Sequence, residues 1–489
     1  MSTPSLTRQA GLSALWQVAG GVWAMVVRLG ASIFLARALT PTDYGIFGMA
    51  IIMRELVEHL GAFGVGAGII ARKSVTEDDL CTCFWLLVGS RIFMFLIAFF
   101  CAPLAGWFFD DSRVIDVVQV ISIAFLFSIL GGLSQTLLFK SLRFKELNIL
   151  RGFFVILESS LAIVLALNTD FGYWSLVIAM MISTFFSELA IFILAGWMPK
   201  FKFNNDSFHY LFRFGINGLG YSITNYLRQN LDYLLVGRLL GATSLGLYEF
   251  AYRIPHLLLD RVSRPVGSVV FPSLSKIQDN NDLLLSGYIK AVKYVCFITF
   301  PVLFGLASVA DVAVPLVWGE QWLPIVTPMR FLCLCAALKM VPQPLGSIYS
   351  CKNRPDLPFK FSIVGLLWTF LVVGSLGYFY GLVGVAIGMV LSVAEGYIAL
   401  FFAFRLANGR LRKLFVELFP ILFSSLLCAA AAFFVSTIFQ NKGFSNIETL
   451  LASIFSGCLV YTLILFVFFP RIISEIKKLI REVVFNKYN

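Results

Sequence analysis

The stretch FLARALTPTDYGIFGMA, residues 34–50, returns in altered form at residues 235–251 as LVGRLLGATSLGLYEFA. The two copies align without a gap, and Gly45 of the first copy falls on Gly246 of the second. Each copy follows one long apolar segment and opens another, which predicts a tight turn between two membrane helices. The repeat therefore predicts that the chain consists of two halves with the same architecture.

A second pair of stretches supports this repeat. Residues 171–183, FGYWSLVIAMMIS, match residues 380–392, YGLVGVAIGMVLS, and Gly172 falls on Gly381. Both pairs are offset by nearly the same distance along the chain. We therefore expect the two halves to be nearly equal in length.

The composition is that of an integral membrane protein. The chain has 489 residues, of which 59% are hydrophobic and 13% charged, whereas soluble domains contain roughly 25% charged residues. The net charge of +11 could suggest a nucleic-acid partner. The basic residues, however, lie between apolar segments, as the positive-inside rule predicts for a membrane protein. We expect no nucleic acid as a partner.

The sequence lacks the motifs of metal and nucleotide sites. C-x-C pairs occur at residues 81–83 and 333–335, but no histidine or second pair stands at the spacing of a zinc site. The phosphate-binding pattern G-x-x-x-x-G-K-S/T is also missing. We therefore expect no metal, no cofactor and no ATP-driven mechanism.

A membrane-spanning helix requires about 20 mostly apolar residues, and fourteen segments of the chain satisfy this condition. The second, seventh and eighth are the least hydrophobic. The segments lie near residues 12–36, 44–68, 81–104, 114–138, 148–168, 173–197, 211–236, 244–271, 287–310, 323–349, 358–380, 382–404, 414–439 and 448–469.

The distribution of basic residues predicts the topology. With the amino terminus in the cytoplasm, inner segments hold about five times as many Lys and Arg residues as outer segments. Only Arg37, Arg113, Arg238 and Lys442 fall outside. One helix more or fewer in the middle of the chain would destroy this asymmetry. We therefore predict an all-α, multi-pass protein with fourteen transmembrane helices and both termini cytoplasmic.

Six helices separate the two copies of the first repeat, and an even number makes the two halves parallel. The fold class predicted is thus two parallel six-helix lobes plus two extra C-terminal helices. The end of the chain carries an apolar stripe beside a basic one, which is typical of a helix that lies on the inner leaflet. The predicted domains are residues 1–200 (helices 1–6), 201–410 (helices 7–12), 411–470 (helices 13–14) and 471–489 (a cytoplasmic amphipathic tail).

Charged residues inside the first, second, seventh and eighth spans fall on single helical faces, because they recur every three, four or seven residues. A charge in the bilayer usually faces a partner or a water-filled cavity, which favours a central cavity between the lobes. Arginine offers a planar fork of donors that suits a phosphate group. The predicted cavity residues are Arg28, Arg54, Tyr221, Asn225, Arg228, Arg253 and Arg264, and the carboxylates that could carry protons or sodium are Glu58, Asp232, Glu249 and Asp260.

A structural alternative explains part of the pattern. Arg54 with Glu58, and Glu249 with Arg253, have the spacing of ion pairs within one helix. Arg28 has no such partner in its own helix. The remaining charges in the spans, including Arg91, Glu158 and Glu188, stand alone in the sequence and are interpreted as residues of helix packing.

Several stretches carry a resemblance to a known family. They are ARALTPTDYGIFGMA (36–50), LRFKELN (142–148), FGYWSLV (171–177), RQNLDYLLVGRLLGATSLGLYEFAYR (228–253), FPSLSKIQD (271–279), WGEQWLP (318–324) and KNRPDL (352–357). On these stretches the chain resembles the polysaccharide (Wzx-type) flippases of the multidrug/oligosaccharidyl-lipid/polysaccharide exporter superfamily.

The resemblance implies a MATE-like fold that works by alternating access in the bacterial inner membrane. The implied substrate is an oligosaccharide repeat unit linked to undecaprenyl pyrophosphate, exported for O-antigen, exopolysaccharide or capsule. Membrane lipids, a polysaccharide polymerase and the chain-length machinery are the other implied partners. Related flippases use cavity arginines on the early helices of each lobe, and Arg28, Arg54, Arg228 and Arg253 occupy comparable places.

Other functions remain open at this point. A lipid II flippase or a drug/cation antiporter of the MATE type would have the same fold, although an antiporter for cations needs an acidic cavity. A different class is a membrane glycosyltransferase or polysaccharide polymerase, for which Asp110 and Asp111 could act as catalytic acids. Such enzymes usually carry a large outer loop or domain, and no loop here is predicted to be that long. We therefore predict a transporter and not an enzyme.

Overall fold

The computed structural model describes residues 6–61, 65–72, 74–263, 274–354, 356–470 and 474, and all regular secondary structure in these ranges is helical. The predicted tail, residues 471–489, lies outside the described residues except for Ser474. The chain divides into two compact units, Met1–Gly246 and Leu247–Asn489. We predicted the first boundary between helical lobes near residue 200, whereas the first unit continues some way into α9.

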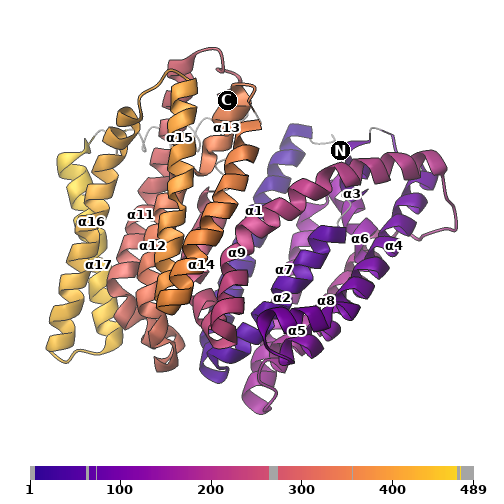
Figure 1. Ribbon diagram of the computed structural model, residues 1–489, viewed down its shortest axis with the longest axis horizontal. Helices are drawn as coiled ribbons and strands as arrows, with labels where there is room; N and C mark the ends of the chain where they lie inside the picture. The colour runs from indigo at the N-terminus through magenta and orange to yellow at the C-terminus, as the bar shows by residue number, and fades with distance from the viewer. Residues whose placement is uncertain are drawn as a thin grey trace. The chain divides into compact units, whose positions relative to one another are not determined.

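Unit 1 is built from helices that pack along their lengths, with α6 against α8 and α1 against α7 (Figure 1). Its elements are α1 (Leu6–Ala38), α2 (Pro41–Gly61), α3 (Val65–Ala71), α4 (Glu77–Phe100), α5 (Ala102–Phe109), α6 (Arg113–Lys140), α7 (Phe144–Asn168), α8 (Trp174–Ala195) and α9 (Asn205–Leu258) as far as Gly246.

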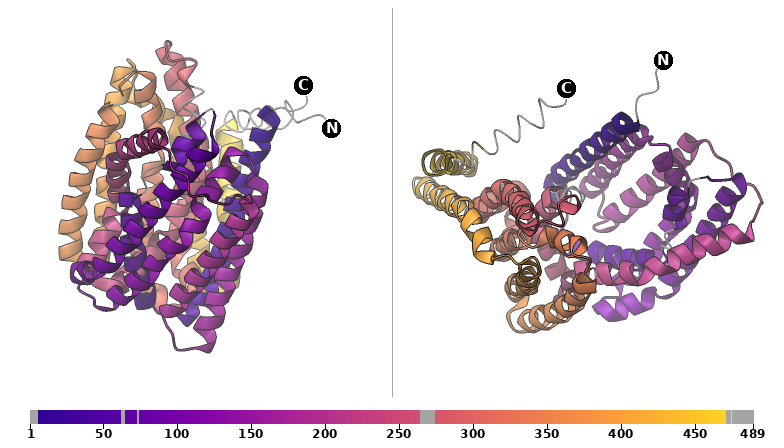
Figure 2. Two further views of the ribbon diagram at one scale, coloured as in Figure 1. Left: turned by 90° about the vertical axis from the view of Figure 1, so that its right-hand side faces the viewer. Right: turned by 90° about the horizontal axis from the view of Figure 1, so that it is seen from above.

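Unit 2 begins with the rest of α9. The helices α16 and α17 lie side by side at its margin, and both pack against α11 (Figure 2). Its remaining elements are η1 (Leu259–Ser263), α11 (Asn281–Trp318), η2 (Glu320–Ile325), α12 (Val326–Met340), η3 (Gln343–Leu345), α13 (Gly346–Cys351), α14 (Asp356–Ser392), α15 (Ala394–Leu406), α16 (Leu411–Asn441) and α17 (Asn446–Phe468).

Local sequence fixes where several of these helices begin and end. Thr76 and Asp79 form a reciprocal capping box at the start of α4, and Ser445 and Glu448 do the same for α17. The helix α8 ends at Ala195, and the next residue, Gly196, has φ of 66°, a left-handed conformation that glycine adopts without strain.

The second repeat in the sequence appears in the backbone. Gly172, before α8, has φ of 54°, and its counterpart Gly381 has φ of 59°. Gly381 interrupts α14, which would otherwise be one helix of 37 residues. Both positive φ values place a sharp change of direction before the matching apolar stretches. The chain therefore turns at equivalent points in the two halves, as the repeat predicts.

The prediction of an all-helical, multi-pass membrane protein is confirmed at this level. Ten helices among the described residues are long and apolar enough to cross a membrane, and the stretch Asp356–Leu406 is one of them although Gly381 breaks it. Neither α2 nor α9 is apolar enough to meet this condition, because both helices carry the charged residues that were predicted to share one helical face. The total of fourteen helices stays a prediction.

Candidate functional site

Three charged residues on α2 and α4 form a cluster inside unit 1. The guanidinium of Arg54 lies 3.5 Å from Glu58 Oε2, and that of Arg91 lies 3.5 Å from Glu58 Oε1. All three side chains are partly buried, and Arg54 also lies over the ring of Phe125, 5.8 Å from its centre. The predicted ion pair of Arg54 with Glu58 therefore exists, and Arg91 joins it from the neighbouring helix. Arg91 was wrongly interpreted as a charge that stands alone.

A second carboxylate approaches this cluster from α8. A Cβ atom on Gly131 of α6 would lie 1.6 Å from Glu188 Oε2, so the carboxylate packs directly against this glycine and a side chain there would displace it. Arg91 and Arg151 both act electrostatically on Glu188. The charged residues of the cluster thus come from four helices, and no pattern in the sequence indicated that Glu188 belongs to it.

Arg28 finds its partner across the helix interface. Its guanidinium lies 3.8 Å from Glu158 Oε2 of α7. The side chain of Arg28 remains 65% exposed and that of Glu158 33% exposed, so the pair leaves most of the Arg28 side chain accessible. The interpretation of Glu158 as an isolated packing residue was wrong. A usable signal did exist, because each residue lies ten positions before the end of its helix, at Ala38 and Asn168.

The part of α9 in unit 1 packs along α2. His59 Nδ1 lies 2.8 Å from Ser222 Oγ, and the hydroxyl of Tyr226 donates a hydrogen bond of 2.6 Å to the carbonyl of Ile52. On the same helix Asp232 is buried, whereas Arg228 is exposed. Arg228 forms no ion pair or hydrogen bond with any other residue that the structure describes. Its guanidinium is therefore available to an anion.

Two more of the predicted site residues, Asn225 and Tyr221, lie on this part of α9. Asn225 is half-buried on α9, three residues before Arg228. The side chain of Tyr221 lies outside the described part of the structure, although the backbone there is helical.

The remaining predicted site residues belong to unit 2. Arg253 donates a hydrogen bond of 2.7 Å to Glu249 Oε1, and its guanidinium lies 4.1 Å from the centre of the Phe250 ring. One turn later, His256 Nδ1 lies 3.5 Å from Asp260 Oδ2, where α9 gives way to the π-helix η1. The predicted pair of Glu249 with Arg253 is present. Arg264 lies outside the described residues.

The two copies of the first repeat meet within unit 1, at a contact that we call the α2–α9 crossing (residues 41–45 and 242–246). A Cβ atom on Gly45 would lie 1.7 Å from the carbonyl oxygen of Ala242, and one on Gly246 would lie 1.9 Å from that of Pro41. These two contacts are related by the same offset of 201 residues that joins Thr42 to Thr243, whose hydroxyls lie 2.8 Å apart. The crossing is therefore a pseudo-twofold contact between the repeats that glycine alone permits.

Side chains around the crossing fix the ends of the helices. Asp43 accepts hydrogen bonds of 2.9 Å from the backbone N–H of Thr40 and 3.0 Å from that of Tyr173. Arg238 donates to the carbonyls of Trp107 and Phe108, at 3.1 and 2.8 Å. Asp43 and Arg238 thus have structural partners here.

The two aspartates that could mimic catalytic acids occupy a turn. Asp110 ends α5 in the left-handed conformation, with φ of 57°. Asp111 accepts hydrogen bonds from Nε and Nη2 of Arg113, at 3.0 and 2.8 Å. These bonds lower the pKa of the Asp111 carboxyl, which is opposite to what a general acid needs.

Comparisons with known proteins address the fold and the family. Residues 34–327 match a family model described as "Polysaccharide biosynthesis protein". The lipopolysaccharide biosynthesis protein WzxC of Escherichia coli is 28% identical over 390 residues, which cover 76% of this chain and 78% of that protein.

Two solved structures share the fold. A lipid II flippase, MurJ, in an inward closed conformation superposes with a TM-score of 0.76 at 17% identity, over 94% of this chain and 100% of that one. An inward-facing MATE family transporter of the MOP superfamily superposes with a TM-score of 0.53 at 15% identity, over 82% of this chain and 96% of that one. The MATE-like fold that the sequence predicts is therefore confirmed.

Proposed function

Because the chain belongs to the family of polysaccharide biosynthesis proteins, we propose that it is a flippase for lipid-linked oligosaccharides. In this proposal it moves oligosaccharide units on undecaprenyl pyrophosphate across the bacterial inner membrane by alternating access. WzxC, a lipopolysaccharide biosynthesis protein, is similar over three quarters of the chain, which supports a surface polysaccharide as the product. Polymerase and chain-length proteins are the partners that would act on the exported unit.

The observation that carries the proposal is that two of the predicted cavity arginines, one on α1 and one on α9, have exposed side chains. Arg28 keeps most of its side chain exposed beside Glu158, and Arg228 is exposed without a partner among the described residues. A buried pyrophosphate needs charge-assisted donors of this kind. We propose that both arginines, together with Arg54, Arg253 and Arg264, bind the pyrophosphate and acidic sugars, with Asn225 and Tyr221 as neutral contacts.

We propose that the carboxylates of the predicted site couple transport to an ion gradient. Transport against a gradient requires an energy source, and Glu58, Asp232, Glu249 and Asp260 are the groups that could exchange a proton or sodium. Glu58 already links two arginines, at 3.5 Å from each. Neutralising it would loosen both arginines at once, which gives a direct way to couple an ion to the cargo.

The test is a strain that lacks this chain. We expect surface polysaccharide to be lost and lipid-linked oligosaccharide to accumulate at the inner leaflet, with both restored by the wild-type protein. Accumulation of lipid II would instead identify a lipid II flippase. Hypersensitivity to cationic drugs with normal polysaccharide would identify an antiporter, a function that the shared MATE fold allows. A block in polymerised sugar, with lipid-linked units already outside, would indicate an enzyme.

We propose fourteen transmembrane helices with both termini cytoplasmic, and reporter fusions test this topology. Fusions at Asn168, Trp318 and Lys442 are expected to report the outer side, because few basic residues lie in those segments. Fusions at Lys145, Asn353 and Tyr488 are expected to report the cytoplasm. A cytoplasmic signal at Trp318 would contradict the two-lobe arrangement.

A further inference from the structure

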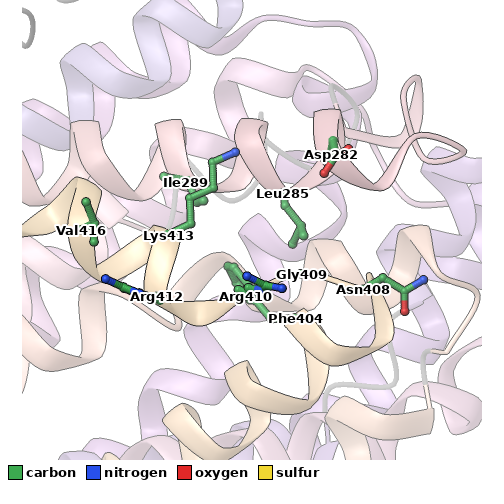
Figure 3. A pocket seen from close by; sticks show the side chains of 10 residues that line it. All are labelled: Asp282, Leu285, Ile289, Phe404, Asn408, Gly409, Arg410, Arg412, Lys413 and Val416. Atoms are coloured by element: carbon green, nitrogen blue, oxygen red, sulfur yellow. The ribbon is translucent and has the colours of Figure 1, made fainter.

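A pocket of about 470 Å³ lies at one end of unit 2, where α11 begins and α15 turns into α16 (Figure 3). This volume is within the range of small-ligand sites. Its wall combines basic and apolar side chains from three helices and the connecting turn. The lining residues are Asp282, Leu285, Ile289, Phe404, Asn408, Gly409, Arg410, Arg412, Lys413 and Val416.

Three cations of this pocket have no ion-pair partner among the described residues, and Asp282 is the one carboxylate in its lining. Arg410, Arg412 and Lys413 form no ion pair and no side-chain hydrogen bond within the described ranges. The nearby carboxylate of Glu417 is already taken, because it accepts a hydrogen bond of 2.9 Å from the buried Lys293. With three cations against the single carboxylate of Asp282, the lining of the pocket carries a net positive charge.

The position of these cations is unfavourable for the helix itself. They flank or occupy the first turn of α16, which contains no acidic residue, and the amino-terminal end of a helix favours negative charge. The positive-inside rule explains why basic residues lie on this side of the membrane. It does not explain why three of them line one cavity.

The apolar part of the wall continues onto the outer surface of α16. Arg412, Val416, Phe419 and Phe423 follow one another at intervals of four, three and four residues, so they share one face of the helix. Val416 is 60% exposed and Phe419 58% exposed. The face thus runs from a cation at the pocket to apolar side chains along the membrane span, as an amphipathic ligand would require.

We propose that this pocket binds the phosphate headgroup of an anionic membrane phospholipid, such as phosphatidylglycerol. The phosphate lies among Arg410, Arg412 and Lys413, and the acyl chains lie along Val416 and Phe419. Basic pockets between membrane helices recognise anionic headgroups in this way. The lipid is a resident ligand, distinct from the transported oligosaccharide.

The experiment measures lipid binding to the purified full-length protein by native mass spectrometry. The protein is delipidated and then titrated with phosphatidylglycerol or phosphatidylcholine. Both lipids carry the phosphate, but the choline cation of phosphatidylcholine is repelled by the three basic side chains. Wild-type protein is therefore expected to retain one phosphatidylglycerol about tenfold more tightly than phosphatidylcholine. The triple variant R410Q/R412Q/K413Q is expected to lose this preference.

A matched control removes three cations that do not line the pocket, in the variant K276Q/K290Q/R405Q, and is expected to keep the preference. The variant V416E supplies a second test, because it places a carboxylate in the wall and leaves all three cations in place. It is expected to weaken phosphatidylglycerol binding more than phosphatidylcholine binding, because the new carboxylate repels the anionic headgroup, whereas both lipids lose the same apolar contact. Equal losses in the pocket and control triples would overturn the proposal.

Two competition experiments test whether the bound phosphate belongs to a phospholipid, to a soluble anion or to the transported cargo. Inorganic phosphate at millimolar concentration is expected to leave the bound lipid in place, since it lacks the acyl chains. An undecaprenyl-pyrophosphate-linked oligosaccharide is also expected to leave it in place. Displacement by either compound would identify a soluble anion site or a cargo site and would refute a resident phospholipid. The readout is binding and not export, so failure of the flippase function would leave this result unaffected.

Discussion

Cysteines at Thr42 and Thr243 are expected to form a crosslink that stops polysaccharide export. The two hydroxyls lie 2.8 Å apart at the α2–α9 crossing, and disulfides form only between side chains that are held this close. If alternating access requires the crossing to separate, a covalent bond there holds the transporter in one state. Export is expected to fall to the fraction of uncrosslinked protein and to return after reduction with dithiothreitol.

The crosslinking experiment needs a background without competing thiols. Cys101 and Cys458 are exposed and are replaced by serine first. The single variants T42C and T243C serve as controls and are expected to export normally. Export that persists in fully crosslinked protein would mean that the crossing stays closed throughout transport.

The same contact predicts the effect of adding a methyl group. In G45A the new Cβ atom would lie 1.7 Å from the carbonyl oxygen of Ala242, so the crossing must shift apart. We expect the crosslinking yield between positions 42 and 243 to fall by at least about half, because a shift beyond disulfide reach prevents the bond. G30A is the matched control on α1, where no atom lies within 4 Å of the new carbon. Equal yields in the two variants would show that the crossing tolerates a side chain.

Loss of a cargo-binding arginine is the second prediction with a large expected effect. Alanine at Arg228 is expected to reduce export about tenfold to a hundredfold, since a charge-assisted hydrogen bond is worth about 1.5–3 kcal/mol. Lysine at this position should restore export only in part, because it keeps the charge but lacks the planar fork. The measurement is surface polysaccharide at matched protein levels in the membrane.

Arg28 allows binding to be separated from structural pairing. If its main role is the pair with Glu158, then R28A and E158Q are expected to lower protein level and export together. If it binds the cargo, R28A reduces export at an unchanged protein level, whereas E158Q has a smaller effect. Normal export in alanine variants of Arg28, Arg54, Arg228 and Arg253 would refute the proposed cationic site.

The sequence predicted the features that depend on neighbours along the chain. The repeat aligned Gly172 with Gly381, and both have positive φ in the structure, because a duplicated turn preserves its backbone requirements. The spacing of four residues predicted the pairs of Glu58 and Glu249 with their arginines.

The sequence did not predict contacts between helices far apart in the chain. Glu158 pairs with a residue 130 positions earlier, and Arg91 reaches Glu58 from another helix. Such pairs depend on how two helices rotate against each other, and periodicity within one helix leaves that rotation undetermined. Because this rotation was undetermined, we left three residues out of the predicted site: Arg91, Glu158 and Glu188.

The α2–α9 crossing also bears on the speed of transport. The hydrogen bond between the two threonines contributes only about 0.5–1.5 kcal/mol, so it does not by itself hold the helices together. Tyr44, Ala242 and Leu245 of the crossing are buried, and exposing apolar surface to water costs about 25 cal/mol per Å². If transport separates the crossing, this apolar surface therefore sets most of the cost of opening. Opening of the crossing would then be a slow step of the cycle, and an ion gradient would act on the population of the open state.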